Sequence, residues 1–161
     1  MVDDLGAGGS GRAGPVHGAG VATRLVWRPS DGGDVSVVGR ARAWLRAALP
    51  TLVGRSTRRY LHDDTELLLC ELVTNALVHG GGVTAVELRH VGQALRVSVR
   101  DGGAEAPIVR DVPPDADYGR GLALVEALAS RWGVDRSHAE PGKCVWLELP
   151  VHPGDTGQRL T

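Results

Sequence analysis

The sequence predicts an α+β fold, a two-layer sandwich in which a mostly antiparallel mixed sheet is covered on one face by helices. Two observations support this class. The expected elements follow in the order strand, helix, helix, two strands, long loop, helix, two strands. Short turns join the consecutive strands, and strands joined in this way pair antiparallel. The helices then have to bury their apolar faces against one side of the sheet, which gives two layers.

The size and charge of the chain narrow its class further. A chain of 161 residues is long enough for one domain with a substantial core. Its formal net charge of −1 provides no positive field for nucleic acid or for an anionic membrane. Apolar runs such as Leu67–Leu69 are far too short to span a bilayer, and the N-terminus lacks a secretory signal pattern. We therefore expect a cytoplasmic protein with no direct nucleic-acid or membrane partner.

The chain divides into one domain and two tails. Residues 1–20 are rich in glycine and alanine, which predicts a disordered N-terminal tail. Residues 21–150 form the expected domain, and residues 151–161 are expected to be a flexible polar tail. Cys70 and Cys144 lie far apart without a paired-cysteine metal motif, so we interpret both as small structural hydrophobes.

The first two elements are a strand and an amphipathic helix. Residues 23–28 alternate like a strand and end at a turn rich in Pro, Ser, Asp and Gly. Residues 34–49 carry apolar side chains at helical spacing, and Pro50 is expected to close that helix. The side chains expected on its core face are Val35, Val38, Ala41, Trp44, Leu45 and Ala48, and those expected toward solvent are Arg40, Arg42 and Arg46.

The central element is a helix over residues 64–79. Asp63 or Asp64 is expected to cap its start, and the glycines at 80–82 to end it. Its leucines, valines and alanines spread around nearly the whole cylinder, and a helix that is apolar all round is normally buried. Against that background, three polar side chains four residues apart form one stripe: Glu71, Asn75 and His79.

The polar stripe allows two interpretations. It could be a structural seam bonded to a neighbouring strand or to buried water, since buried polar groups have to be satisfied. It could instead bind a polar ligand or a metal. The amide oxygen of Asn75 is a hard, neutral ligand suited to Mg²⁺, and the carboxylate of Glu71 one turn away can act as a general base.

The second half of the chain predicts four strands and one helix. Residues 83–90 and 95–100 form two strands around a turn at 91–93, and a proline-rich loop follows over 104–118. A helix opens at 119–121 and ends near 129. Residues 132–135 and 143–149 then form a closing hairpin. The core-facing side chains expected in the helix are Leu122, Val125, Leu128 and Ala129.

Three glycine-rich segments suggest ligand contacts. Asp101 ends a strand before two glycines, so a flat ligand could approach and donate an amino group to its carboxylate, although an Asp-Gly pair is also an ordinary turn. Gly119-Arg-Gly121 at a helix N-terminus is either an anion site or a hinge. Gly142-Lys143 lacks the flanking residues of a P-loop, so we exclude that motif.

These motifs together resemble the N, G1, G2 and G3 boxes of the GHKL ATPase superfamily. The boxes are Glu71-x-x-x-Asn75-x-x-x-His79, then Asp101-Gly-Gly103, then Gly119-Arg-Gly121-Leu-Ala-Leu, then Gly142-Lys143. The ordered set resembles most the stand-alone anti-sigma-factor serine/threonine kinases, over roughly residues 24–150. The resemblance implies the Bergerat, or histidine-kinase-like, fold with ATP and Mg²⁺ as cofactors.

The resemblance also implies a role for each box residue. Glu71 would be the general base, Asn75 would ligate the Mg²⁺ that bridges the phosphates, and Asp101 would bind the adenine amino group. The remaining nucleotide-binding positions would be His79, Gly103, Gly119, Arg120, Gly121, Leu122 and Lys143. Two positions depart from the family pattern, since Glu105 and Ala123 stand where glycines are usual.

The expected activity is phosphorylation of an anti-sigma factor antagonist of the STAS type by a protein that can also hold a sigma factor. The alternative is a nucleotide-gated binding module without kinase activity. A metal-dependent hydrolase built on Glu71 and His79 is a remote third option, because a third ligand is missing at suitable spacing. The resemblance also suggests a homodimer through the first strand and first helix, where Trp27 and Trp44 lie, although core packing would explain both tryptophans equally well.

Overall fold

The described part of the computed structural model forms one sheet of five strands. The structure describes residues 24–53, 59–103, 120–136 and 141–151, so the predicted N-terminal tail, the 104–118 loop and all but Val151 of the C-terminal tail lie outside the described residues. The strands are β1 (Arg24–Trp27), β2 (Val83–Val91), β3 (Ala94–Asp101), β4 (Arg131–Asp135) and β5 (Lys143–Pro150). Their order is β1-β2-β3-β5-β4, and every described pairing is antiparallel.

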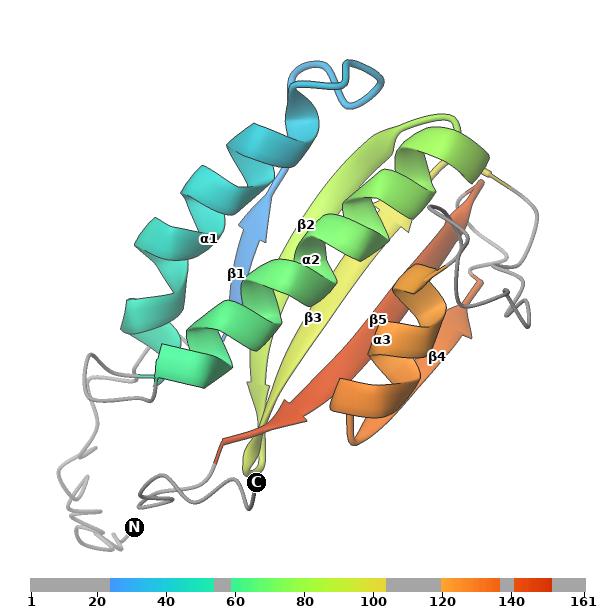
Figure 1. The fold of residues 1–161 in the computed structure, drawn as a ribbon. Coiled ribbons are helices and arrows are strands. Elements are labelled where there is room, and N and C mark those ends of the chain that lie inside the picture. The colour runs from blue at the N-terminus through green and yellow to red at the C-terminus, as the bar shows by residue number, and fades with distance from the viewer. Residues whose placement is uncertain (1–23, 54–58, 104–119, 137–140, 152–161) are drawn as a thin grey trace, which may run out of the picture.

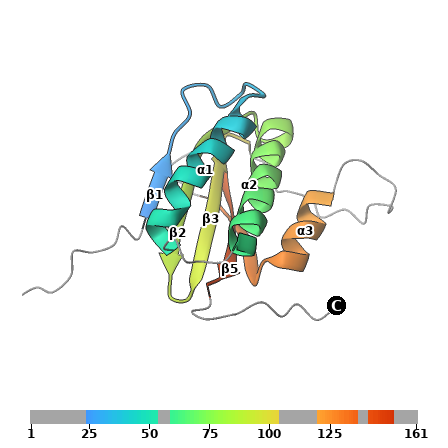
Figure 2. The same cartoon turned by 60° about the vertical axis from the view of Figure 1, so that its left-hand side comes forward.

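In the described ranges, three helices cover one face of this sheet (Figures 1 and 2). They are α1 (Val37–Val53), α2 (Arg59–His79) and α3 (Arg120–Leu128). Helix α2 lies between the other two helices, and it contacts β3 and β5 as well as α1 and α3. The predicted two-layer α+β sandwich is therefore confirmed.

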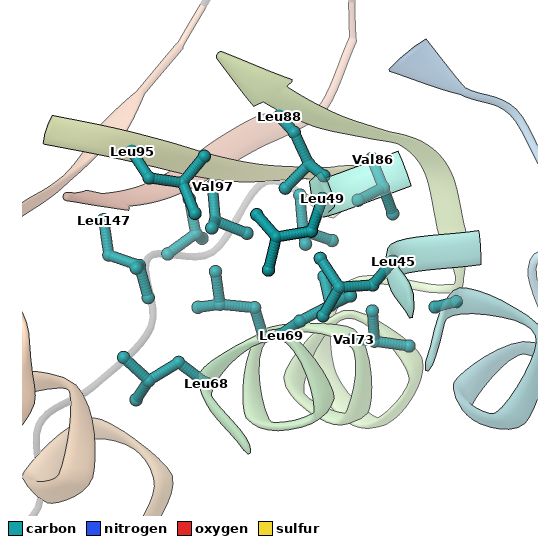
Figure 3. Close-up of a cluster of buried hydrophobic side chains, with 14 of the residues drawn as sticks. Leu45, Leu49, Leu68, Leu69, Val73, Val86, Leu88, Leu95, Val97 and Leu147 are labelled. Atoms are coloured by element: carbon teal, nitrogen blue, oxygen red, sulfur yellow. The ribbon is translucent and has the colours of Figure 1, made fainter. Parts of the chain in front are cut away.

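The hydrophobic core fills the space between the two layers (Figure 3). Alternate residues of each central strand point toward the helices, as the period of two in a strand requires. Between these layers lie the fully buried leucines and valines of α1 and α2. The labelled core residues are Leu45, Leu49, Leu68, Leu69, Val73, Val86, Leu88, Leu95, Val97 and Leu147.

Helix α1 differs from its prediction at both ends. Pro50 lies inside the helix, and the chain continues helical to Val53. A proline removes one backbone donor, and near the last turn that loss is tolerated because Leu52 is buried there. The predicted inward orientation of Val35 is wrong, since this residue precedes the helix and is 79% exposed.

Helix α2 begins five residues earlier than predicted, at Arg59, so neither Asp63 nor Asp64 caps it. The extra turn buries Leu61, whose carbonyl accepts a hydrogen bond from the Thr65 hydroxyl. The helix is also not buried on all sides, because Leu67 is 41% exposed and Val78 is 67% exposed. The side of α2 away from the sheet therefore faces outward.

The two tryptophans of the first strand and first helix stack on each other. The ring centroids of Trp27 in β1 and Trp44 in α1 lie 6.2 Å apart, and both rings pack against the core. Aromatic pairs at this separation stabilise the contact between elements. Core packing within one chain therefore accounts for both residues.

Candidate functional site

The site begins where α2 ends. The backbone N–H groups of Gly80 and Gly82 both donate to the carbonyl of Ala76, at 2.9 and 3.0 Å. Gly81 has a φ of +70°, a conformation that favours glycine. The predicted glycine stop is confirmed, and it brings the end of α2 beside the end of β3, because Gly80 packs against Asp101.

Asp101 is the buried polar centre of this corner. It is 2% exposed, and its Oδ1 accepts hydrogen bonds from the backbone N–H of Gly103 at 2.9 Å and from Nζ of Lys143 at 3.0 Å. Lys143 is 3% exposed and lies directly opposite Asp101 in the β3–β5 register. Three predicted site residues therefore meet at one point, and the Lys143 ammonium is already engaged there.

Glycines form the walls around this carboxylate. A Cβ atom at Gly80 would overlap the carboxylate of Asp101, and one at Gly142 would overlap its carbonyl oxygen. A Cβ atom at Gly103 would lie 2.8 Å from Cα of Gly80 and 3.2 Å from Nζ of Lys143. Only residues without side chains fit here. Gly80 was interpreted from the sequence as a helix stop, and no sequence signal indicates its contact with Asp101.

Glu71 lies farther back on α2, against the first turn of α3. A Cβ atom at Gly121 would lie 2.5 Å from Oε2 of Glu71, so the two groups are in close contact. The Glu71 side chain is partly buried, and burial raises its pKa above the ordinary value. The carboxylate that was predicted as a base therefore faces the helix start that was predicted to hold phosphate.

Asn75 lies between these two ends of the site. It is partly buried, one helical turn from Glu71 and one turn from His79, or about 6 Å in each direction. Neither the Asn75 side chain nor the Glu71 side chain forms a hydrogen bond with any residue that the structure describes. A seam bonded to a neighbouring strand is thus not present in the described part of the chain. His79 is exposed at the helix end.

The other predicted positions are only partly described. Arg120 begins α3 and Leu122 lies in its first turn, while Gly119 falls outside the described residues. Within the described ranges, no three His, Cys, Asp or Glu side chains cluster as a metal site, so the hydrolase option gains no third ligand. No helix in those ranges is long and apolar enough to cross a membrane.

Residues 34–149 match the family described as the histidine kinase-like ATPase domain. The match covers more than two thirds of the chain, including α1 to β5. The chain belongs to this family. Asp101 and the stripe on α2 lie within the matched residues, and ATP is the ligand that the family implies. No curated protein sequence matches the chain.

One solved structure shares the fold, and another gives a weaker superposition. The structure of the RsbU and RsbW domains of Rv1364c from Mycobacterium tuberculosis superimposes with a TM-score of 0.57 at 21% identity, covering 83% of this chain and 35% of that chain. The histidine kinase domain of the blue-light activated histidine kinase EL346 from Erythrobacter litoralis gives a TM-score of 0.43 at 25% identity, covering 72% and 60% of the two chains. The chain thus spans about a third of the first structure.

Proposed function

We propose that the protein binds Mg-ATP along α2 and transfers its γ-phosphoryl group to a serine or threonine of an anti-sigma factor antagonist. The observation that carries the proposal is that two partly buried polar side chains lie on the same helix that ends beside a buried carboxylate. The side chains of Glu71 and Asn75 are partly buried and have no hydrogen-bond partner among the described residues. The buried carboxylate of Asp101 lies at the end of the same helix, in walls made of glycine.

The adenine end of the ligand fits Asp101. Both hydrogen bonds to this carboxylate reach Oδ1, and Oδ2 receives none from the described residues. Oδ2 is thus an acceptor for the exocyclic amino group of adenine. Gly80 packs against Asp101, and Gly103 packs against Gly80 and Lys143, so neither residue adds side-chain bulk beside the carboxylate.

The phosphate end of the ligand fits Asn75 and the start of α3. Asn75 supplies an amide oxygen of the kind that Mg²⁺ accepts alongside phosphate oxygens. The first turn of α3, from Arg120, presents backbone N–H groups and the positive end of the helix dipole. Bound Mg²⁺ would neutralise charge that develops on the phosphates.

Glu71 is the proposed general base. Its carboxylate would take the proton from the hydroxyl of the substrate, the hydroxyl oxygen would bond to the γ-phosphorus, and ADP would leave with the bridging oxygen. A pKa raised by burial makes a carboxylate a stronger base. The fold shared with the RsbU and RsbW domains of Rv1364c, together with the ordered box motifs, supports a regulatory kinase and its STAS-type antagonist, a sigma factor, or both as partners. A homodimer through β1 and α1 belongs to the same proposal.

The alternative is a binding module whose affinity for a partner protein depends on ATP without phosphoryl transfer. Glu105, which stands where the family usually has glycine after Asp101, favours this alternative because it departs from the family's nucleotide-binding motif.

The test combines nucleotide binding with label transfer. Purified wild type, Glu71→Ala and Asn75→Ala are incubated with Mg²⁺, γ-labelled ATP and candidate antagonist proteins. Thr74→Ala, an exposed neighbour on α2, is the matched control. The kinase proposal predicts that Asn75→Ala loses binding, that Glu71→Ala keeps binding but loses transfer, and that Thr74→Ala retains both.

Two other outcomes separate the hypotheses. If ATP binds and alters affinity for a sigma factor or antagonist, but no label is transferred, the binding module is correct and the kinase is wrong. If the wild type binds no ATP at micromolar to millimolar concentrations, both are wrong, and the residues of the stripe have another role.

A further inference from the structure

We infer that Lys143 is a positioning residue that fixes the Asp101 carboxylate and thereby makes the site selective for 6-aminopurine nucleotides. The inference rests on the proposed function, because it concerns the base-binding end of the same pocket. It goes beyond nucleotide binding itself, since it assigns to one lysine the discrimination between adenine and 6-oxopurine bases.

Lysine is rare in this chain, and the lysine at position 143 is buried. Lys143 is the only lysine in the sequence, and the other 17 basic residues counted with it are arginines. Lysine is almost never fully buried unless it is paired, yet this one is 3% exposed. A compact ammonium fits a small space beside glycine backbone, whereas the planar guanidinium of arginine needs more room. The single lysine is therefore located where its size and charge are both required.

The contacts of Lys143 indicate that it orients the carboxylate of Asp101. Its Nζ donates to Oδ1 of Asp101, and Gly103 donates its backbone N–H to the same oxygen. Gly103 also lies beside Nζ, because a Cβ atom there would come within 3.2 Å of it. Two donors on one oxygen hold the carboxylate plane in one orientation. Oδ2 then remains as an acceptor that is fixed in direction.

A fixed acceptor discriminates between bases. The amino group at position 6 of adenine donates to Oδ2, whereas the oxygen at position 6 of inosine or guanine would face it as a second acceptor. A buried polar site that is built for a donor rejects a ligand that lacks one far more strongly than an apolar pocket could. Without Lys143 the carboxylate would lose its buried partner charge and one of the two hydrogen bonds that orient it.

The first test measures affinities for ATP and for inosine triphosphate with wild type and Lys143→Met. We expect the wild type to prefer ATP by roughly 100-fold or more, and the variant to reduce this ratio by at least about 10-fold. A merely structural lysine would weaken both nucleotides equally and leave the ratio unchanged. An unchanged ratio in a folded variant therefore overturns the inference, while ATP binding by the wild type keeps the proposed function intact.

A second variant covers loss of folding. Lys143→Met leaves a buried carboxylate without its partner charge, so the double variant Asp101→Asn with Lys143→Met removes both charges together. We expect the double variant to fold and to bind ATP and inosine triphosphate with similar affinity. Retention of the wild-type ratio in the double variant contradicts the inference.

A third measurement needs no substitution. Lysine labelled with ¹³C and ¹⁵N reports on one residue only, because the chain has a single lysine. We expect adenosine triphosphate to shift the side-chain signal of Lys143 and inorganic tripolyphosphate to leave it in place. No shift with ATP, under conditions where ATP binds, overturns the inference. No ATP binding by the wild type contradicts the proposed function instead.

Discussion

At the scale of single residues, Glu71 occupies an environment that favours its protonated form. The side chain is partly buried, and burial alone raises its pKa above the ordinary value of 4.5. No described cation pairs with Glu71 to offset this effect. Arg42 and Arg46 bind instead to Glu66, five residues earlier on α2. A group of this kind contributes stability below its unfolded pKa and loses that contribution as the pH rises through its higher folded pKa.

Glu71→Gln is therefore expected to stabilise the protein at neutral pH. The gain should be largest above the raised pKa, decline as the pH falls toward 4.5, and vanish below that value, where the wild-type carboxyl is protonated in both states. Thermal unfolding of both proteins from pH 4 to pH 8 measures the difference. The same variant should lose about 10²-fold or more in phosphoryl transfer. A variant that is less stable than the wild type at pH 7 would contradict the assigned environment.

Gly121 sets the distance between Glu71 and α3. A Cβ atom there would lie 2.5 Å from Oε2 of Glu71, so Gly121→Ala has to displace the carboxylate. Alanine has a helix propensity about 1 kcal/mol better than that of glycine, which offsets part of the strain. We expect phosphoryl transfer to fall by at least about 10-fold, because small misplacements of catalytic groups are costly.

Gly39→Ala is the matched control for this prediction. Gly39 lies within α1, and a Cβ atom there meets nothing within 4 Å. This control should gain about 0.5–1 kcal/mol of stability and leave the transfer rate unchanged. Equal transfer rates in Gly121→Ala and wild type would show that the contact with Glu71 does not matter for the reaction.

At the scale of elements, one carboxylate links α1 to α2. Glu66 accepts from Arg42 at 2.8 Å and from Arg46 at 2.7 Å, two arginines that lie one turn apart on α1. The hydrogen bonds from Arg46 and Arg42 lower the pKa of Glu66. The side chains of Arg42 and Arg46 are 45% and 64% exposed, so water and salt weaken the attraction. The predicted outward orientation of these arginines is confirmed, but each has a partner on the next helix.

Glu66→Gln is expected to destabilise the protein by less than about 1 kcal/mol at neutral pH. A carboxyl with a lowered folded pKa contributes stability above its unfolded pKa, and this contribution is lost as the pH falls through the folded value. The difference from wild type should therefore shrink below about pH 4.5 and also in 1 M salt. Asp63→Asn, an exposed site on the same helix, should show no comparable effect in urea unfolding.

The ends of elements were less predictable than their centres. The apolar pattern of α1 suggested an end at Pro50, yet burial of Leu52 in the core extends the helix by three residues. The acidic pair Asp63 and Asp64 resembled a cap, but burial of Leu61 moves the start of α2 to Arg59. In both places tertiary burial outweighed a local signal, because one buried leucine contributes more than a single cap.

At the scale of the whole molecule, the site joins four elements that meet only in the folded state. Glu71 and Asn75 come from α2, Asp101 from β3, Gly121 from α3 and Lys143 from β5. A ligand that contacts all of them would connect both layers of the sandwich and the two sides of the central helix. It would bind the native state and not the unfolded chain, so binding energy adds directly to stability.

Mg-ATP at about 100 times its dissociation constant is expected to add about 2.7 kcal/mol of stability. For a domain of this size that corresponds to an increase of roughly 5–10 °C in melting temperature. Differential scanning fluorimetry with and without Mg-ATP measures the shift. Thr74→Ala should show the full increase, and Asn75→Ala should show almost none. An equal shift in both variants would exclude Asn75 as a ligand position.

The sequence alone determined the features that depend on local repeats. The periodicity of apolar residues predicted three helices and five strands in the correct order, and a spacing of four placed Glu71, Asn75 and His79 on one stripe. The ordered glycine boxes indicated the family, which the match over residues 34–149 confirms. These signals lie within a few residues of each other or in a fixed order, so they can be interpreted without knowledge of long-range contacts.

Only the tertiary structure decided which groups touch. Asp101 and Lys143 are 42 residues apart, and the register between β3 and β5 makes them a buried pair. Gly80 is glycine because the carboxylate of Asp101 lies against its Cα, and Gly121 because Glu71 does the same. Such contacts depend on strand pairing and on the packing of helices over a sheet. A local sequence pattern does not contain these contacts, because the two groups of each contact come from segments that lie far apart in the chain.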